Sequence, residues 1–156
     1  MKNYKKIDPK DEKAAEKSAL NLIKYRARSE KELSSRLKEK GFDEEVIAKV
    51  VEKCKKSGLI DDKLFAYLYA YDKLTLDNKG PMFIQYELKR LGVDERLILE
   101  ALEKVKSEVD INTIALELAK NYYEKTQDTL KTKAYLYRRG FEPDIINCVI
   151  EDIRGD

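Results

Sequence analysis

The chain has 156 residues, of which 42% are hydrophobic and 40% are charged, with six glycines and three prolines. This composition excludes collagen-like and low-complexity classes and favours long amphipathic helices. The net charge is only +2, but residues 1–60 carry 17 Lys and Arg against 11 Asp and Glu. A basic N-terminal third is therefore expected, and a uniformly basic nucleic-acid coat is excluded.

No apolar run approaches the roughly 20 residues that cross a bilayer, and charged residues interrupt the first 17 positions, where a secretory signal would be apolar. We therefore expect a cytoplasmic protein without membrane contact. Cys54 and Cys148 have no partner at metal-ligand spacing. Both are predicted to be buried small hydrophobes in a reducing compartment.

Residues 1–12 are polar and predict a flexible N-terminal tail. Helices are then expected at 13–27, from Ser29 to Gly41, and at 44–57. Apolar residues at helical spacing predict the first, and Ser29 with Glu32 three residues later predicts a capping box for the second. These helices form the first predicted unit, residues 13–60.

The second predicted unit covers residues 61–109, with helices at 62–73, from Pro81 to Gly92, and at 95–108. Asp61 is expected to cap its first helix, which carries the apolar and aromatic residues Leu64, Phe65, Tyr67, Leu68 and Tyr71. Residues 110–156 form the third unit, with helices at 111–124, 129–139 and 143–154. Asp110 caps its first helix, and Thr129 is assigned a cap role in its second.

Three similar corners punctuate the chain. Gly41, Gly92 and Gly140 each follow a helix and lie four residues after a leucine. Each glycine precedes an apolar residue and then an acid. Left-handed glycine suits a helix C-terminus, and the acid (Asp43, Asp94 or Glu142) suits the N-cap of the next helix. The glycines lie 51 and 48 residues apart.

This spacing predicts an all-α protein of three tandem three-helix (helix-turn-helix-like) repeats, stacked into an elongated, curved rod. Each glycine is expected to be architectural. Its replacement by alanine is expected to cost about 1 kcal/mol at every corner.

The sequence gives no support for catalytic activity. The sequence contains no histidine, no phosphate-binding glycine loop and no cysteine-rich metal signature. Asp61 and Asp62 form the one adjacent carboxylate pair at a loop, and a helix cap followed by a first-turn acid explains them. We therefore predict a protein that is not an enzyme and that uses no cofactor and no metal.

Basic residues recur near helix ends, with tyrosines between them in the third unit. Several could line one side of the array and meet a periodic partner such as a filament or a nucleic acid. The candidate contact residues are Lys24, Arg26, Arg28, Lys38, Lys89, Arg90, Lys131, Lys133, Tyr135, Arg138 and Arg139. Tyr67, Tyr69 and Tyr71 are assigned to the core and its edge.

Four stretches resemble the signature segments of the RecX family of regulatory proteins. They are residues 28–33 (RSEKEL), 58–66 (GLIDDKLFA), 79–81 (KGP) followed by 87–88 and 92–93, and 135–141 (YLYRRGF). The likeness covers roughly residues 14–153. It implies tandem three-helix repeats and a cytoplasmic modulator of the RecA recombinase that binds along the groove of the RecA filament on DNA. Leu91 and the pair Met82 and Phe83 depart from the family pattern.

The resulting prediction is a monomeric regulatory protein that binds the RecA filament on single-stranded DNA. It would inhibit filament extension, ATPase, strand exchange and SOS co-protease activity, with weak nonspecific DNA contact. The alternative is a stand-alone helix-turn-helix DNA-binding protein. The acidic starts of the helices after Gly41, Gly92 and Gly140 argue against it, because they would repel phosphates. A generic helical adaptor for another protein is a third reading.

Overall fold

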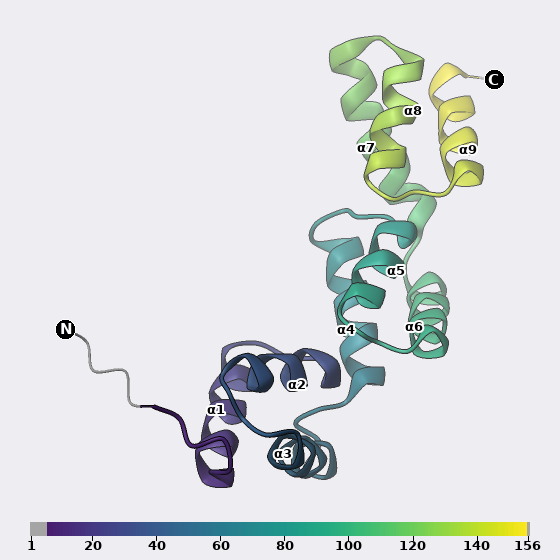
Figure 1. Ribbon diagram of the computed structural model, residues 1–156. Coiled ribbons are helices and arrows are strands. Elements are labelled where there is room, and N and C mark those ends of the chain that lie inside the picture. The colour runs from purple at the N-terminus through teal and green to yellow at the C-terminus, as the bar shows by residue number, and fades with distance from the viewer. Residues whose placement is uncertain (1–5, 156) are drawn as a thin grey trace. The chain divides into compact units, whose positions relative to one another are not determined.

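The computed structural model describes residues 6–155 and contains no strand within them (Figure 1). The all-α class predicted from the sequence is confirmed. The helices of this described part are α1 Glu12–Tyr25, α2 Glu30–Glu39, α3 Glu44–Lys56, α4 Asp62–Thr75, α5 Pro81–Arg90, α6 Glu95–Glu108, α7 Ile111–Thr126, α8 Thr129–Arg138 and α9 Pro143–Arg154.

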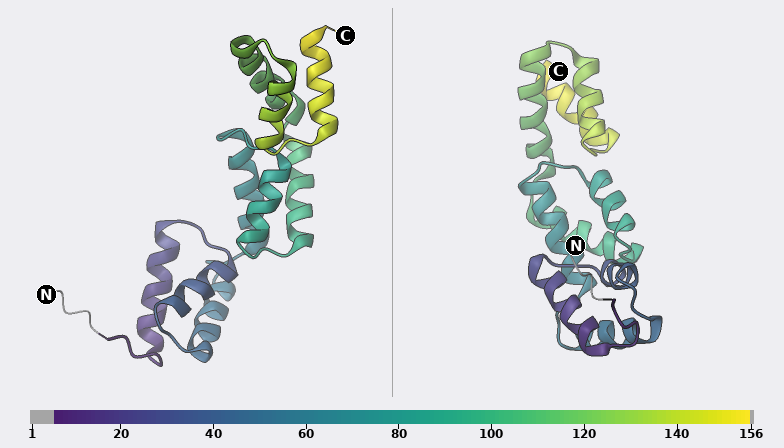
Figure 2. Two further views of the ribbon diagram at one scale, coloured as in Figure 1. Left: turned by 45° about the horizontal axis from the view of Figure 1, so that its top comes forward. Right: turned by 60° about the vertical axis from the view of Figure 1, so that its left-hand side comes forward.

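The helices form three-helix repeats: α1 to α3, α4 to α6, and α7 to α9, here called repeats 1, 2 and 3. Within repeat 1 each helix contacts the other two, and the same holds in repeat 3 (Figures 1 and 2). Leu37, Leu88 and Leu136 are fully buried at equivalent places in α2, α5 and α8. The three repeats thus share one core position on the middle helix.

Chain contacts divide the molecule into two compact units. The first contains α1 to α3, the first turn of α4 and residues 91–93, and the second contains residues 66–90 and 94–156. The second repeat therefore contributes to both compact units. The predicted domain boundaries, after residue 60 and after residue 109, stay a prediction.

Side-chain capping sets several helix starts. Ser29 accepts a hydrogen bond from the Glu32 backbone N–H while the Glu32 side chain accepts from the Ser29 N–H, so the predicted capping box is confirmed. Asp61 and Asp110 accept from the N–H groups of Leu64 and Thr113. Both act as the predicted caps.

Three cap predictions differ in part from the structure. Asp43 and Glu142 are the N-cap residues of α3 and α9, as predicted, but they make no side-chain cap hydrogen bond. The glutamate is one carbon longer than the side chains preferred at this position, while nothing in the structure explains Asp43. In α8 the cap is Asp128, which accepts from the Lys131 N–H at 3.0 Å, and Thr129 is the first helical residue.

Part of the predicted tail is bound to repeat 1. Asp11 caps α1, which begins at Glu12, and the Pro9 carbonyl accepts a hydrogen bond from the Asp43 N–H at 2.9 Å. Glu12, which the sequence assigns to the tail, is therefore helical, and hydrogen bonds join Pro9 and Asp11 to repeat 1. Residues 1–5 lie outside the described part of the chain.

The three corner glycines have positive φ angles of +101° at Gly41, +82° at Gly92 and +98° at Gly140. This is the conformation expected for a left-handed residue after a helix. At the first and third corners the next N–H, from Phe42 or Phe141, donates to the carbonyl of the leucine five positions back. Both corners therefore carry the long bond of a Schellman motif.

The corner of repeat 3 is joined to the start of α5 by backbone hydrogen bonds. The Gly80 N–H donates to the Arg139 carbonyl at 2.7 Å, and the Met82 N–H donates to the Gly140 carbonyl at 2.9 Å. A Cβ on Gly80 would lie 2.3 Å from the Gly140 carbonyl carbon. Glycine at position 80 thus permits close approach of two backbones.

A similar joint occurs within the first unit. The Ser29 hydroxyl donates to the Leu91 carbonyl at 2.6 Å, and a Cβ on Gly92 would meet the Lys31 side chain. Ser29 and Gly80 both directly precede the middle helix of their repeat, so the same place is used twice. In each case a donor there holds the carbonyl of the residue before the corner glycine of the next repeat.

The apolar residues of α4 are buried on one side only, and of the two cysteines predicted to be buried only one is. Leu64 and Leu68 are exposed, and the buried face of α4 is instead formed by Phe65, Ala66, Ala70 and Leu74. Cys148 is exposed whereas Cys54 is buried. These helices are apolar over more than one face, so periodicity alone did not show which face is covered.

Candidate partner-binding surface

The most exposed basic and aromatic surface of repeat 3 lies on α8. Lys131 and Arg138 are exposed seven residues apart, which places them on one side of the helix. Tyr137, which precedes Arg138 in the sequence, is 59% exposed. This face, defined by Lys131, Tyr137 and Arg138 and here called the α8 face, combines positive charge with an open aromatic ring. Such a surface suits an acidic protein or a nucleic-acid backbone with stacked bases.

Two of the residues predicted in α8 have internal partners instead. The Tyr135 ring stacks on Tyr122 with 4.3 Å between ring centroids and a 4° angle between planes. The Arg139 guanidinium donates to the carbonyls of Asp77 and Asn78, which lie about sixty residues earlier. Both are structural, and the exposed tyrosine is Tyr137. Lys133, the remaining α8 candidate, is half-buried.

Arg28 is also a structural residue. It is 6% exposed, its Nε donates to the Leu22 carbonyl at 3.2 Å, and its guanidinium lies 3.7 Å from the Glu32 carboxylate. Burial lowers the pKa of Arg28, and neighbouring Arg26 lowers it further, while Glu32 opposes both. Arg26 pairs with the same carboxylate. Of the three basic residues predicted at the end of α1 and just after it, Lys24 and Arg26 are exposed, and Arg26 is engaged by Glu32.

Glu32 is expected to make the stability depend on acid pH. Burial acts to raise the pKa of its carboxyl, but hydrogen bonds from Arg26 and the Ser29 N–H, with the charges of both arginines, lower it below the ordinary 4.5. A depressed folded-state pKa stabilises the protein above the ordinary pKa, and this stabilisation is lost as pH falls through the folded value. The free energy of unfolding should therefore decline below about pH 4.5.

Urea unfolding of wild type and Glu32→Gln across the acid range measures this effect. The variant should lack the part of the decline that Glu32 contributes. Glu39→Gln is the control, because Glu39 is an exposed carboxylate with an exposed partner, Arg36. Equal acid slopes for wild type and Glu32→Gln would contradict the assignment.

The middle helices of repeats 1 and 2 carry exposed cations at their ends. Lys89 and Arg90 are exposed, with Arg90 paired to Glu87 at 2.7 Å, and Lys38 lies 3.8 Å from Glu44. Tyr86, on the same helix as Lys89 and Arg90, is 67% exposed. Sequence reasoning missed Tyr86. Its position one turn before Lys89 on a short helix was the signal that could have found it.

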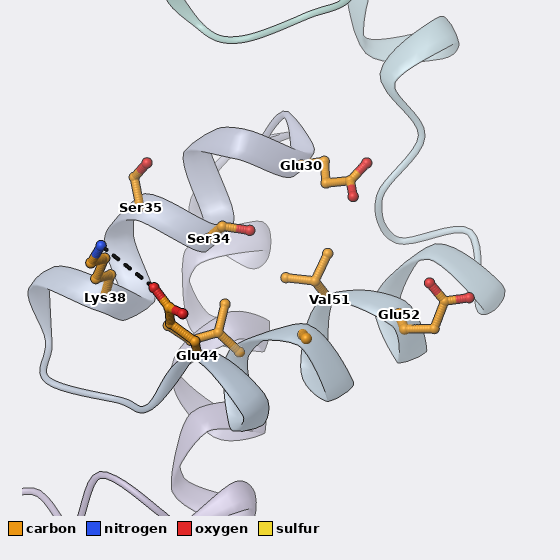
Figure 3. A pocket seen from close by; sticks show the side chains of 9 residues that line it. Glu30, Ser34, Ser35, Lys38, Glu44, Val51 and Glu52 are labelled. Atoms are coloured by element: carbon orange, nitrogen blue, oxygen red, sulfur yellow. Dashed lines mark ion pairs between the residues drawn. The ribbon is translucent and has the colours of Figure 1, made fainter.

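A groove of about 450 Å³ lies between α2 and α3 (Figure 3). Ile47, Ala48 and Val51 form its apolar side, and Lys38 and Glu44 face each other across one end. The small side chains of Ser34 and Ser35 leave the space open. The groove has no catalytic pair at hydrogen-bonding distance.

Within residues 6–155 no group of three or more acidic or cysteine side chains could hold a metal ion. None of the helices in this range is long and apolar enough to span a membrane.

The fold and surface define a helical-repeat protein with three-helix units and exposed basic helix ends. Residues 15–54 match the model of the first three-helix domain of RecX, and residues 61–102 match that of the second. The chain is 38% identical to the Regulatory protein RecX of Thermotoga petrophila and 40% identical to that of Thermotoga maritima. Each alignment covers 88% of this chain and 83% of the relative. The chain belongs to the RecX family.

Solved structures agree with this assignment. The crystal structure of RecX from Lactobacillus salivarius superposes with a TM-score of 0.82 at 26% identity, covering 94% of this chain and 98% of that one. A second crystal structure, of a regulatory protein RecX, gives a TM-score of 0.77 at 26% identity, over 88% of this chain and 70% of that one. The Regulatory protein RecX of Oceanobacillus iheyensis is 33% identical, and the alignment covers 51% of it.

Proposed function

We propose that the protein is a cytoplasmic, non-catalytic regulator that binds the RecA filament on single-stranded DNA. It restrains filament extension, ATPase, strand exchange and SOS co-protease activity. Family membership supports the regulatory role, since the relatives are named regulatory proteins. The observation that carries the contact is the α8 face, which presents two exposed cations and an exposed tyrosine on one helix.

The chemistry of these exposed groups favours binding to an extended anionic partner. Lys131 and Arg138 have no ion-pair partner within the described residues. Their charges therefore remain available to carboxylates of the recombinase or to DNA phosphates. Tyr86, Lys89 and Arg90 provide a second cationic and aromatic surface on α5. Two modest contacts on a periodic partner reinforce each other, because the second forms at high effective concentration.

The test measures RecA ATPase and strand exchange on single-stranded DNA with the protein below the RecA concentration. We expect both rates to fall. Unchanged rates would refute the proposal. The stand-alone DNA-binding alternative predicts instead tight, sequence-dependent binding to naked duplex DNA with a steep dependence on salt. We expect only weak, nonspecific binding in that titration.

A further inference from the structure

Two surfaces recur in the three repeats and fit each other. The first is the corner, meaning the corner glycine and the residue before it. The second is the helix start, meaning the residue before the middle helix and the first two residues of that helix. Leu91 O meets Ser29, and the carbonyls of Arg139 and Gly140 meet Gly80 and Met82. The corner of each later repeat thus binds the helix start of the preceding one.

The helix start of repeat 3 is left open. Ser29 and Gly80, which directly precede α2 and α5, are buried, whereas Asp128, which directly precedes α8, is only half-buried. Leu130, the second residue of α8, is 76% exposed. Within residues 6–155, no backbone hydrogen bond joins a corner glycine, or the residue before it, to this place.

The corner of repeat 1 is open as well. Gly41 is exposed and a Cβ placed on it would meet nothing within 4 Å, while a Cβ on Gly92 would meet Lys31 of α2 and one on Gly140 would meet Phe83 of α5. Within residues 6–155 no backbone hydrogen bond reaches the carbonyls of Lys40 or Gly41. The carbonyl that corresponds to Lys40 O is an acceptor at both other corners, and the one that corresponds to Gly41 O is an acceptor at the third.

The two open surfaces carry opposite charges. Lys40 occupies the place of Arg139, whose guanidinium already reaches across its joint to the carbonyls of Asp77 and Asn78. Asp128 presents a carboxylate at the open helix start. We propose that the Lys40 corner of one copy binds the Asp128 helix start of a second copy, so that copies associate head to tail.

Such a contact is heterologous and leaves a free corner and a free helix start on every assembly, so it can repeat. A single joint is small, and the expected dissociation constant is about 0.1 to 1 mM. The protein is therefore a monomer when dilute and associates where copies are concentrated. The inference needs no RecA and stands apart from the proposed function.

The experiment uses sedimentation velocity of the full chain from about 10 µM to about 1 mM, the range in which so weak a joint forms. Lys40→Glu disrupts only the corner surface, because the glutamate repels Asp128 of the second copy. Leu130→Arg disrupts only the helix-start surface, because the arginine repels Lys40 of the second copy. Each variant alone should remain monomeric at the highest concentration. An equimolar mixture should form a dimer and no larger species, since one intact corner then meets one intact helix start.

Leu76→Arg is the matched control for Leu130→Arg, because Leu76 is 74% exposed and belongs to neither surface. It should associate like wild type. Three outcomes would overturn the proposal: a wild-type monomer at about 1 mM, self-association of either single variant, or a mixture that stays monomeric. Circular dichroism of each variant verifies that the helices are intact.

Discussion

Replacing Gly140 with alanine is expected to destabilise the protein by about 3 kcal/mol and to lower its Tm by roughly 6 to 12 °C. Two costs add. A φ of +98° disfavours any residue with a Cβ by about 1 kcal/mol. The new Cβ would also lie 2.5 Å from the Phe83 Cβ and 2.6 Å from its backbone nitrogen, so the joint between repeats 2 and 3 must open.

Gly41→Ala is the matched control. Its φ is +101°, but the added Cβ would meet nothing within 4 Å, so only the conformational cost of about 1 kcal/mol remains. The equal cost that the sequence predicts for all corners therefore fails at Gly140. Thermal unfolding followed by circular dichroism compares the two variants, and equal Tm shifts would contradict the packing argument.

Reversing the charges of the α8 face with Lys131→Glu and Arg138→Glu is expected to weaken the effect on RecA at least about tenfold. The expected change reflects two lost attractions and two new repulsions at the proposed contact. The readout is the protein concentration that half-inhibits strand exchange. The fold should survive, because both side chains are exposed and have no internal ion pair in the described chain.

Lys13→Glu with Lys17→Glu provides the same change in net charge on α1. Both lysines are exposed and outside the candidate surface. This control should inhibit like wild type apart from a small general electrostatic loss. If the two double variants lost inhibition equally, overall charge would be responsible and the α8 face would not be the contact.

Local signals predicted the helices well. The capping box of Ser29 and Glu32 and the positive φ of Gly140 depend on residues a few positions apart, which a single sequence displays directly. The missing cap hydrogen bonds of Asp43 and Glu142, and the cap at Asp128 in place of Thr129, shift no helix start from its predicted residue. These helices form without the predicted cap hydrogen bonds because tertiary packing contributes more to helix stability in a protein than a single cap does.

The candidate surface was less predictable because it depends on distant partners. Arg28, Tyr135 and Arg139 have the residue types of a binding surface, yet the fold gives each an internal partner. Arg139 donates a hydrogen bond to the carbonyl of Asn78, which lies 61 residues earlier. No local sequence pattern predicts this pairing. Arg138, its immediate neighbour, points away and stays exposed. Adjacent arginines on one helix thus separate into a structural and a surface residue.

The use of backbone groups at the joint between repeats 2 and 3 has an evolutionary consequence. Gly80 and Met82 donate through N–H groups, and Arg139 and Gly140 accept through carbonyls, so this joint constrains few side chains beyond the glycines. Side chains elsewhere can then diverge while the arrangement persists. This fits the Lactobacillus salivarius structure, whose TM-score of 0.82 accompanies only 26% identity. Related proteins can thus alter what they recognise without rebuilding the scaffold.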